Sequence, residues 1–137
     1  MASSLTRVVR FGARHSMRVA GWPEARIRST FGALADPHHH DYRCSVTVTG
    51  RLDHALGMVV DLGELDHILR DEVLRLEGGD LNRDVPVFAG GRAFPTCEAL
   101  AAYLYDRVAA RLPSGVRLER LRVAEDETLY GDCTGPA

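Results

Sequence analysis

Alternation of apolar and polar residues predicts the first strand, which runs from Leu5 to His15. One parity holds Leu5, Val9, Phe11, Ala13 and His15, and the other holds Thr6, Arg10 and Arg14. Successive side chains of a strand point to opposite faces, so we expect His15 to end the buried face. The next strand is predicted at 41–51 (DYRCSVTVTGR), a run rich in β-branched residues.

Apolar residues at helical spacing predict two helices farther along the chain. Asp61, with Glu64 three residues later, resembles a capping box. Leucine, isoleucine and valine then recur every three or four residues until Gly78 and Gly79, which are expected to end the helix. Thr96 is the predicted cap of the second helix. Its apolar stripe consists of Leu100, Tyr103, Leu104, Val108 and Leu112.

Two more strands are predicted near the end of the chain, at 116–125 and 128–132, whereas 16–36 is expected to be an irregular insertion. The order β-β-α-α-β-β indicates an α+β fold, a four-stranded antiparallel sheet with two helices on one face. The 137 residues are expected to form one domain, 1–137. Its open edges and uncovered face favour self-association.

The composition narrows the possible partners and the compartment. All 17 basic residues are arginine, they are scattered, and the formal net charge is −2, so we do not expect nucleic-acid binding. An apolar run long enough to cross a membrane is absent from the sequence, and we expect no membrane partner. Three widely spaced cysteines and no recognisable secretory signal favour a reducing cytoplasm over a disulfide scaffold.

The candidate chemistry centres on three consecutive histidines, His38, His39 and His40. On a strand, His38 and His40 point the same way and His39 points opposite. Together with His15 from the neighbouring strand, they could supply three nitrogens to a zinc ion and leave a coordination position open, as catalytic zinc requires. The alternative for a bare run of histidines is a polar, solvated loop.

Six motifs in sequence order resemble the 6-pyruvoyl-tetrahydropterin synthase / 6-carboxytetrahydropterin synthase family, which are enzymes of the tunnelling fold (T-fold). FGARH at 11–15 resembles the family's F-S-A-x-H, and HHHDY at 38–42 resembles its H-G-H-N-Y. The other four are GMV-x-DL at 57–62, LN at 81–82, PTCE at 95–98 and VAE at 123–125. The resemblance covers nearly the whole chain.

The resemblance implies a zinc site at His15, His38 and His40, and a hexamer of two stacked trimers that forms a barrel with active sites between subunits. It also implies that Glu98 grips the amidine edge of a pterin, because a carboxylate can accept two parallel N–H bonds from that edge. Thr96 and Cys97 would add hydroxyl and backbone contacts. A residue favoured by the helix dipole is the alternative for Glu98.

The proton-transfer residues of the family are kept only in part, because the acid is kept in kind at Glu77 and the histidine is lost. Leu34 stands where the family has a catalytic cysteine or glutamate, and Glu77-Gly78 replaces its Asp-His pair. Glu125 is the best substitute, because a carboxylate in a partly dry pocket can act as a general base or acid. Glu77 and Asp36 are weaker candidates, as is His39. Cys44 is ~13 Å along the strand from His40 and is expected in the core.

Three functions remain open from the sequence. The first is a zinc-dependent lyase or cyclase with altered acid/base residues, acting at a zinc-bound hydroxy or keto side chain of a pterin or another small-molecule substrate. The second is 6-pyruvoyl- or 6-carboxytetrahydropterin synthase activity on 7,8-dihydroneopterin triphosphate. The third is a non-catalytic oligomer that binds pterin or metal.

Overall fold

The computed structural model describes residues 2–91 and 93–137. Met1 and Arg92, both within the predicted domain 1–137, lie outside the described residues. The strands are β1 (Ala2–His15), β2 (His38–Arg51), β3 (Gly79–Asp80), β4 (Val116–Asp126) and β5 (Leu129–Cys133). The α-helices are α1 (Glu24–Phe31), α2 (Leu62–Glu72), α3 (Leu81–Asp84), α4 (Pro86–Ala89) and α5 (Cys97–Ala109). Two 3₁₀ helices cover Gly32–Ala35 and Leu74–Leu76.

The sheet has the strand order β3-β1-β2-β4-β5. β1 and β2 pair antiparallel along their whole length, from Ala2 opposite Arg51 to His15 opposite His38. The four predicted strands and their order are confirmed, and β3 is an addition that pairs parallel to the end of β1. β3 has only two residues, so no alternation in the sequence could reveal it.

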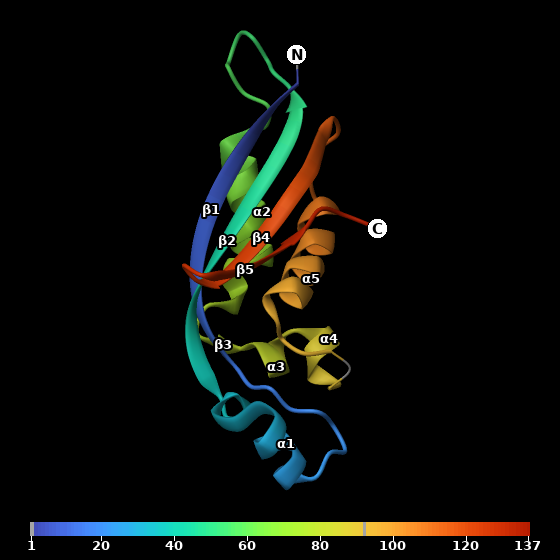
Figure 1. Cartoon of the computed structure of the whole chain (residues 1–137). Helices are drawn as coiled ribbons and strands as arrows, with labels where there is room; N and C mark the ends of the chain where they lie inside the picture. The colour runs from blue at the N-terminus through green and yellow to red at the C-terminus, as the bar shows by residue number, and fades with distance from the viewer. Residues whose placement is uncertain (1, 92) are drawn as a thin grey trace.

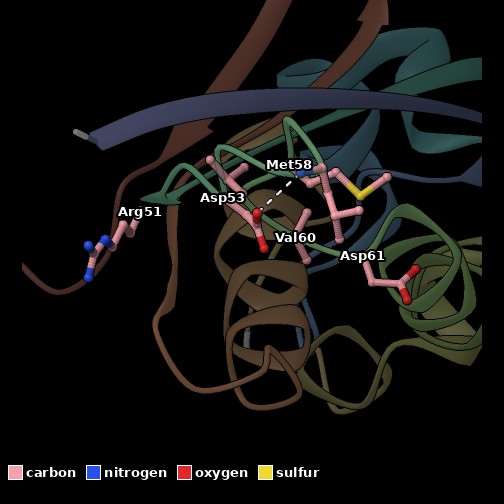
Figure 2. A pocket seen from close by; sticks show the side chains of 7 residues that line it. Arg51, Asp53, Met58, Val60 and Asp61 are labelled. Atoms are coloured by element: carbon pink, nitrogen blue, oxygen red, sulfur yellow. Dashed lines mark hydrogen bonds between the residues drawn. The ribbon is translucent and has the colours of Figure 1, made fainter.

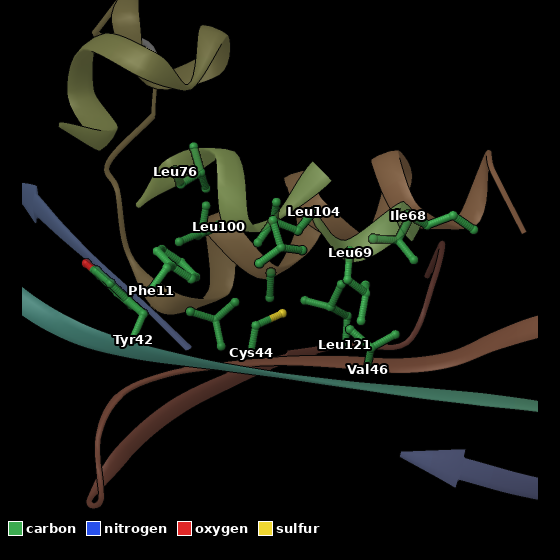
Figure 3. Close-up of a cluster of buried hydrophobic side chains, with 14 of the residues drawn as sticks. Phe11, Tyr42, Cys44, Val46, Ile68, Leu69, Leu76, Leu100, Leu104 and Leu121 are labelled. Carbon is green, nitrogen blue, oxygen red and sulfur yellow. The ribbon is translucent and has the colours of Figure 1, made fainter. Parts of the chain in front are cut away.

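Helices α2 and α5 cover one face of the sheet, as Figure 1 shows. The core lies between them and the strands, where Phe11, Val46 and Leu121 meet Leu69 and Leu104 (Figure 3). Cys44 is also fully buried there, as predicted. The opposite face of the sheet carries no helix in the described part of the chain (Figure 1), and β1 and β2 place Arg10 directly opposite Arg43 on it.

Both predicted helix caps are present. The Asp61 carboxylate accepts hydrogen bonds from the backbone N–H groups of Gly63 and Glu64, at 2.9 and 3.3 Å. The Thr96 hydroxyl accepts one from the N–H of Ala99 at 3.1 Å. The first helix was predicted to continue to Gly78, but α2 ends at Glu72 and the chain tightens into a 3₁₀ turn before Glu77.

The insertion 16–36 is not irregular throughout, because it contains α1 and the 3₁₀ helix that follows it. Ile27 is the one buried residue of α1, so the segment has almost no apolar periodicity to recognise. Its position is fixed by aromatic contacts: Trp22 stacks on Phe31, and Phe31 packs edge-on against Phe94. α1 therefore lies at the end of the sheet where β1 ends and β2 begins (Figure 1).

None of the helices in the described residues is long and apolar enough to cross a membrane.

An ion pair between the two covering helices gives a test of the packing. Glu72 of α2 is buried, and the guanidinium of Arg107 from α5 contacts its two oxygens at 2.8 and 3.2 Å. We expect Arg107→Ala to lower the free energy of unfolding by about 2 kcal/mol, because it leaves a buried carboxylate unpaired while Arg107 itself is half exposed. Urea unfolding measures the change. Arg111→Ala, which breaks an exposed pair with Asp71, is the control and should cost less than about 1 kcal/mol.

Candidate metal centre

The end of the β1–β2 ladder brings three histidines together. His15 is the last residue of β1, and its partner across the ladder is His38, the first residue of β2. His40 lies two residues along β2 and therefore faces the same way. One ring nitrogen from each of the three lies within 4.8 Å of the other two, which is the arrangement that the sequence predicted.

The buried member of the cluster, His15, is held in one orientation and in one tautomer. Its Nδ1 lies 2.8 Å from the carbonyl oxygen of Pro95, which can only accept, so Nδ1 carries the proton. The Tyr42 hydroxyl lies 3.2 Å from the same nitrogen. Nε2 therefore presents a lone pair to the cluster, and it is buried with no hydrogen-bond partner among residues 2–91 and 93–137. Burial lowers the pKa of His15 to about 4, so the ring is neutral at pH 7.

His38 is oriented in the same manner. Its Nδ1 donates to the backbone carbonyl of Asp36 at 2.8 Å, which leaves its Nε2 free. Histidines that bind metals usually donate their second ring nitrogen to a carbonyl or carboxylate in this way. An unpaired buried nitrogen such as Nε2 of His15 costs about 1–3 kcal/mol, and a cation bound there would offset that cost. These three imidazoles fit a zinc ion with an open coordination position.

Glu125 is the one predicted carboxylate that reaches the histidines. Its Oε2 lies 3.5 Å from Nε2 of His40 and 4.0 Å from Nε2 of His15, and its side chain is 16% exposed. The β4–β5 ladder shifts register between Ala124 and Asp126, on either side of Glu125. A bulge of this kind re-aims a side chain at the end of a strand. The carboxylate can therefore exchange a proton with a group held beside the cluster.

The start of α5 lies next to the same cluster. The Pro95 carbonyl that orients His15 immediately precedes the cap residue Thr96. Cys97 is buried and its thiol contacts the backbone of Glu125, whereas Glu98 is exposed in the first turn of the helix. β5 packs closely here, because a Cβ on Gly131 would stand 2.7 Å from the backbone nitrogen of Glu98. Thr96 and Cys97 thus have structural contacts of their own, while the Glu98 side chain is exposed to solvent.

Asp36 lies two residues before His38 and Glu77 is distant in sequence from all three histidines, and the carboxylates of both have other partners. Glu77 accepts a hydrogen bond from the backbone N–H of Gly12 on β1. Asp36 forms a two-bond ion pair with Arg28, at 2.6 and 2.8 Å. The structure therefore does not bring these two carboxylates to the three histidines within one chain.

Two of the positions that match the family's proton-transfer residues carry no proton-transfer group. Leu34 is a half-exposed hydrocarbon side chain, and Gly78 adopts a φ of +73°, a conformation suited to glycine. Cys44 cannot replace them, because it is fully buried between the helices and the sheet (Figure 3).

A pair that was not predicted, between the imidazole of His39 and the carboxylate of Asp41, lies on the opposite face of the sheet. Nε2 of His39 lies 2.9 Å from Oδ1 of Asp41. The ring lies across β1 at Gly12, where a Cβ would stand 2.7 Å from Cε1 of His39. Gly12, His39 and Asp41 are three departures from the motifs F-S-A-x-H and H-G-H-N-Y. Their shared register across β1 and β2 could have revealed that they meet.

A separate cavity of about 420 Å³ lies at the far end of the sheet, beside the loop between β2 and α2 (Figure 2). Its lining includes Arg51, Asp53, Met58 and Asp61. β2 begins at His38 and ends at Arg51, so the whole length of that strand separates this cavity from the histidines.

Fold and site together define an α+β protein with an imidazole cluster at one end of its sheet. Residues 4–136 match the family model described as 6-pyruvoyl tetrahydropterin synthase. The chain belongs to this family.

Relatives agree with this family assignment. The 6-pyruvoyl tetrahydrobiopterin synthase of Poecilia reticulata is 32% identical, with 90% of this chain and 84% of the relative covered. The human enzyme of that name is 31% identical (91% and 86%). A dihydroneopterin monophosphate aldolase of Pyrococcus furiosus is 26% identical (84% and 82%). The solved structure of Caenorhabditis elegans 6-pyruvoyl tetrahydropterin synthase superposes with a TM-score of 0.87 at 24% identity, and covers 99% and 97% of the two chains.

The cysteines give a test of the site's chemistry. Burial raises the pKa of Cys44 to about 12 and that of Cys97 to about 11, and the thiolate is the reactive form. We expect iodoacetamide at pH 8 to modify the partly exposed Cys133 readily, and the other two only after unfolding in guanidinium chloride. Mass spectrometry of peptides locates the label. Fast labelling of Cys97 in the folded protein would show that a nucleophilic thiol does lie at the site.

Proposed function

We propose that this protein is a zinc-dependent lyase of pterin metabolism that cleaves the hydroxylated side chain of a pterin. The observation that carries the proposal is the cluster of three imidazoles, in which the buried Nε2 of His15 has no hydrogen-bond partner among the described residues. Membership of the family supports the pterin substrate and the lyase class. In this proposal His15, His38 and His40 hold the metal. Bound zinc would supply a Lewis acid that acts on oxygen atoms of the substrate.

Glu125 is the proposed general base. Its carboxylate lies beside the rings of His15 and His40, and its low exposure keeps that carboxylate from being fully hydrated. A carboxylate at this place can take a proton from a substrate hydroxyl and return it to carbon after the bond breaks. Proton-transfer roles for Glu77 and Asp36 stay predictions, and the other contacts of those two carboxylates favour Glu125.

Glu98 is the proposed anchor of the pterin ring. Its place in the first turn of α5 leaves it exposed, and the bond between His15 and Pro95 ties that turn to the metal ligands. A substrate held at both points would present its side chain to Glu125 in a fixed orientation. Thr96 and Cys97 support this anchor through the helix cap and through contact with the Glu125 backbone.

The reaction that fits these residues best is aldol-type cleavage of a carbon–carbon bond. Such a cleavage needs only an electrophile and one base. The chain has Leu34 and Gly78 at two positions where the family has proton-transfer groups, so a reaction with a single base suits it better. The similarity to an enzyme named dihydroneopterin monophosphate aldolase favours this choice. Synthase activity on 7,8-dihydroneopterin triphosphate is the second candidate, favoured by the relatives named as synthases.

We also propose a homo-oligomer, a hexamer of two trimers, in the cytoplasm. Association between copies is supported by the edges and the open face of the sheet in the described residues. The outer edge of β1 pairs with β3 only at Ala13 and Arg14, β5 is a short edge strand, and one face of the sheet carries no helix. The three unpaired cysteines favour a reducing compartment.

The metal site gives the first test of this proposal. Protein purified with zinc present should hold one zinc ion per chain, measured by plasma mass spectrometry after gel filtration. His38→Ala should lose most of it, because two imidazoles bind zinc far more weakly than three. His39→Ala, its neighbour on the opposite face, is the matched control and should keep a full complement. Metal-free wild-type protein after zinc supplementation would contradict the proposal.

The reaction gives the second test. Zinc-loaded protein is incubated with dihydroneopterin, its monophosphate and its triphosphate, and products are followed by mass. Aldol cleavage leaves a hydroxymethyl side chain and keeps the phosphate groups on the released fragment. Synthase activity instead eliminates triphosphate and leaves either an intact pyruvoyl side chain or a carboxyl group. Glu125→Gln should lower turnover by about 10²–10⁴-fold and retain zinc.

Asp126→Asn, a change of the adjacent carboxylate, is the control and should stay near the wild-type rate. Undiminished turnover in Glu125→Gln would exclude Glu125 as the base, and loss of zinc would make it a ligand instead. Binding of all three pterins without any product would favour a non-catalytic binding protein.

A further inference from the structure

Four charged side chains beside the metal centre form a closed ring. Arg18 contacts Glu24 at 2.8 Å, and Glu24 contacts Arg28 at 3.2 Å. Arg28 contacts Asp36 at 2.6 Å, and Asp36 lies 3.9 Å from Arg18. Two positive and two negative groups alternate around the ring, so each charge has two opposite neighbours. The ring links the segment after β1 and helix α1 to the segment just before β2.

The ring of ion pairs fixes the backbone of the residues that precede His38. The Asp36 carbonyl accepts the hydrogen bond that orients the His38 ring, while the carboxylate of the same residue is held by Arg28. Arg18 also donates to the carbonyl of Ala35 at 3.1 Å. The backbone of Met17 donates to the carbonyl of Leu34 at 2.9 Å. Pro37 further limits the conformation of Asp36. The backbone before His38 is thus fixed at three successive carbonyls.

We propose that this ring positions the imidazole of His38 for metal binding, with Arg28 and Asp36 as positioning residues rather than catalytic ones. The inference rests on the proposed function, because it concerns affinity for the zinc ion of that site. In this proposal Asp36 acts through its ion pair with Arg28, which holds the carbonyl that orients His38. Helix α1, which buries only Ile27, contributes by carrying Arg28.

The size of the effect follows from the exposure of the ring. The side chains of Arg28 and Asp36 are 44% and 54% exposed, so one such pair adds little to overall stability. A hydrogen-bond partner of a metal-binding histidine changes metal affinity about 10–100-fold when it is removed. The ring acts one bond farther away, through the carbonyl of Asp36, so we expect an effect of about three- to tenfold at low salt. Salt screens exposed charges and should reduce it.

The test compares Arg28→Ala with Arg7→Ala. Arg7 is also 44% exposed and pairs with Asp66 at 2.8 Å, but it lies in the half of β1 remote from His15. Zinc dissociation constants are measured by competition with a colorimetric chelator, at low salt and in 1 M NaCl. Arg28→Ala should bind zinc about three- to tenfold more weakly at low salt and approach wild type in high salt. Arg7→Ala should stay within about twofold of wild type.

Two further measurements separate positioning from loss of fold. The melting temperature of the metal-free protein should be nearly equal in Arg28→Ala and Arg7→Ala, and Arg28→Lys should restore most of the affinity. In the cobalt-substituted protein, the visible absorption bands should shift in Arg28→Ala only, since they report the ligand geometry. If Arg28→Ala does not fold, Asp36→Asn, which keeps the carbonyl and loses the charge, should show the same loss.

The outcomes distinguish this inference from the proposed function. Zinc affinity in Arg28→Ala or Asp36→Asn equal to that of Arg7→Ala would overturn the positioning role and leave the metal site standing. A wild-type protein that binds no zinc would overturn both. A loss of affinity that persists unchanged in 1 M NaCl would also count against the ring, because it would not arise from exposed charges.

Discussion

The register between β1 and β2 is the constraint on which the site depends. With His15 opposite His38, the side chains of His15, His38 and His40 share the face that the helices cover. A slip of one residue would turn His38 and His40 to the opposite face and present His39 to His15 instead. The register is held by the apolar residues of both strands, since Phe11 and Tyr42 stack inside the core at 5.1 Å. Packing of the core therefore determines which histidines face one another at the end of the β1–β2 ladder.

The site is also tied to the rest of the fold through the backbone carbonyls that its histidines face. His15 donates to Pro95 before α5, and His38 donates to Asp36 after α1. The His15 ring is thus oriented by a segment distant from it in sequence, and the His38 ring by a turn that ion pairs hold. The carboxylate of Glu125 completes the group from a third strand. Five parts of the chain therefore meet at one end of the sheet: the end of β1, the turn before β2, the start of β2, the segment before α5 and the end of β4. The strands β1 and β2 supply the three imidazoles, and the other parts orient or neighbour them.

Much of this arrangement could be predicted from sequence, because it follows from strong local patterns. Alternation around Phe11 and the capping residues Asp61 and Thr96 placed the main strands and helices. The parity of His38 and His40 placed the histidines on one face. The unpredicted parts lack such patterns: β3 has two residues, and α1 buries only Ile27. The partners of Asp36 and Glu77 depend on contacts between distant segments, which no local spacing encodes.

The contact between Gly12 and His39 couples two positions of the sheet. A Cβ at position 12 would stand 2.7 Å from Cε1 of His39, so a serine there requires the exposed imidazole to shift from its place beside Asp41. The consequences of exchanging residues 12 and 39 are therefore not independent, because the glycine matters only while an imidazole lies across it.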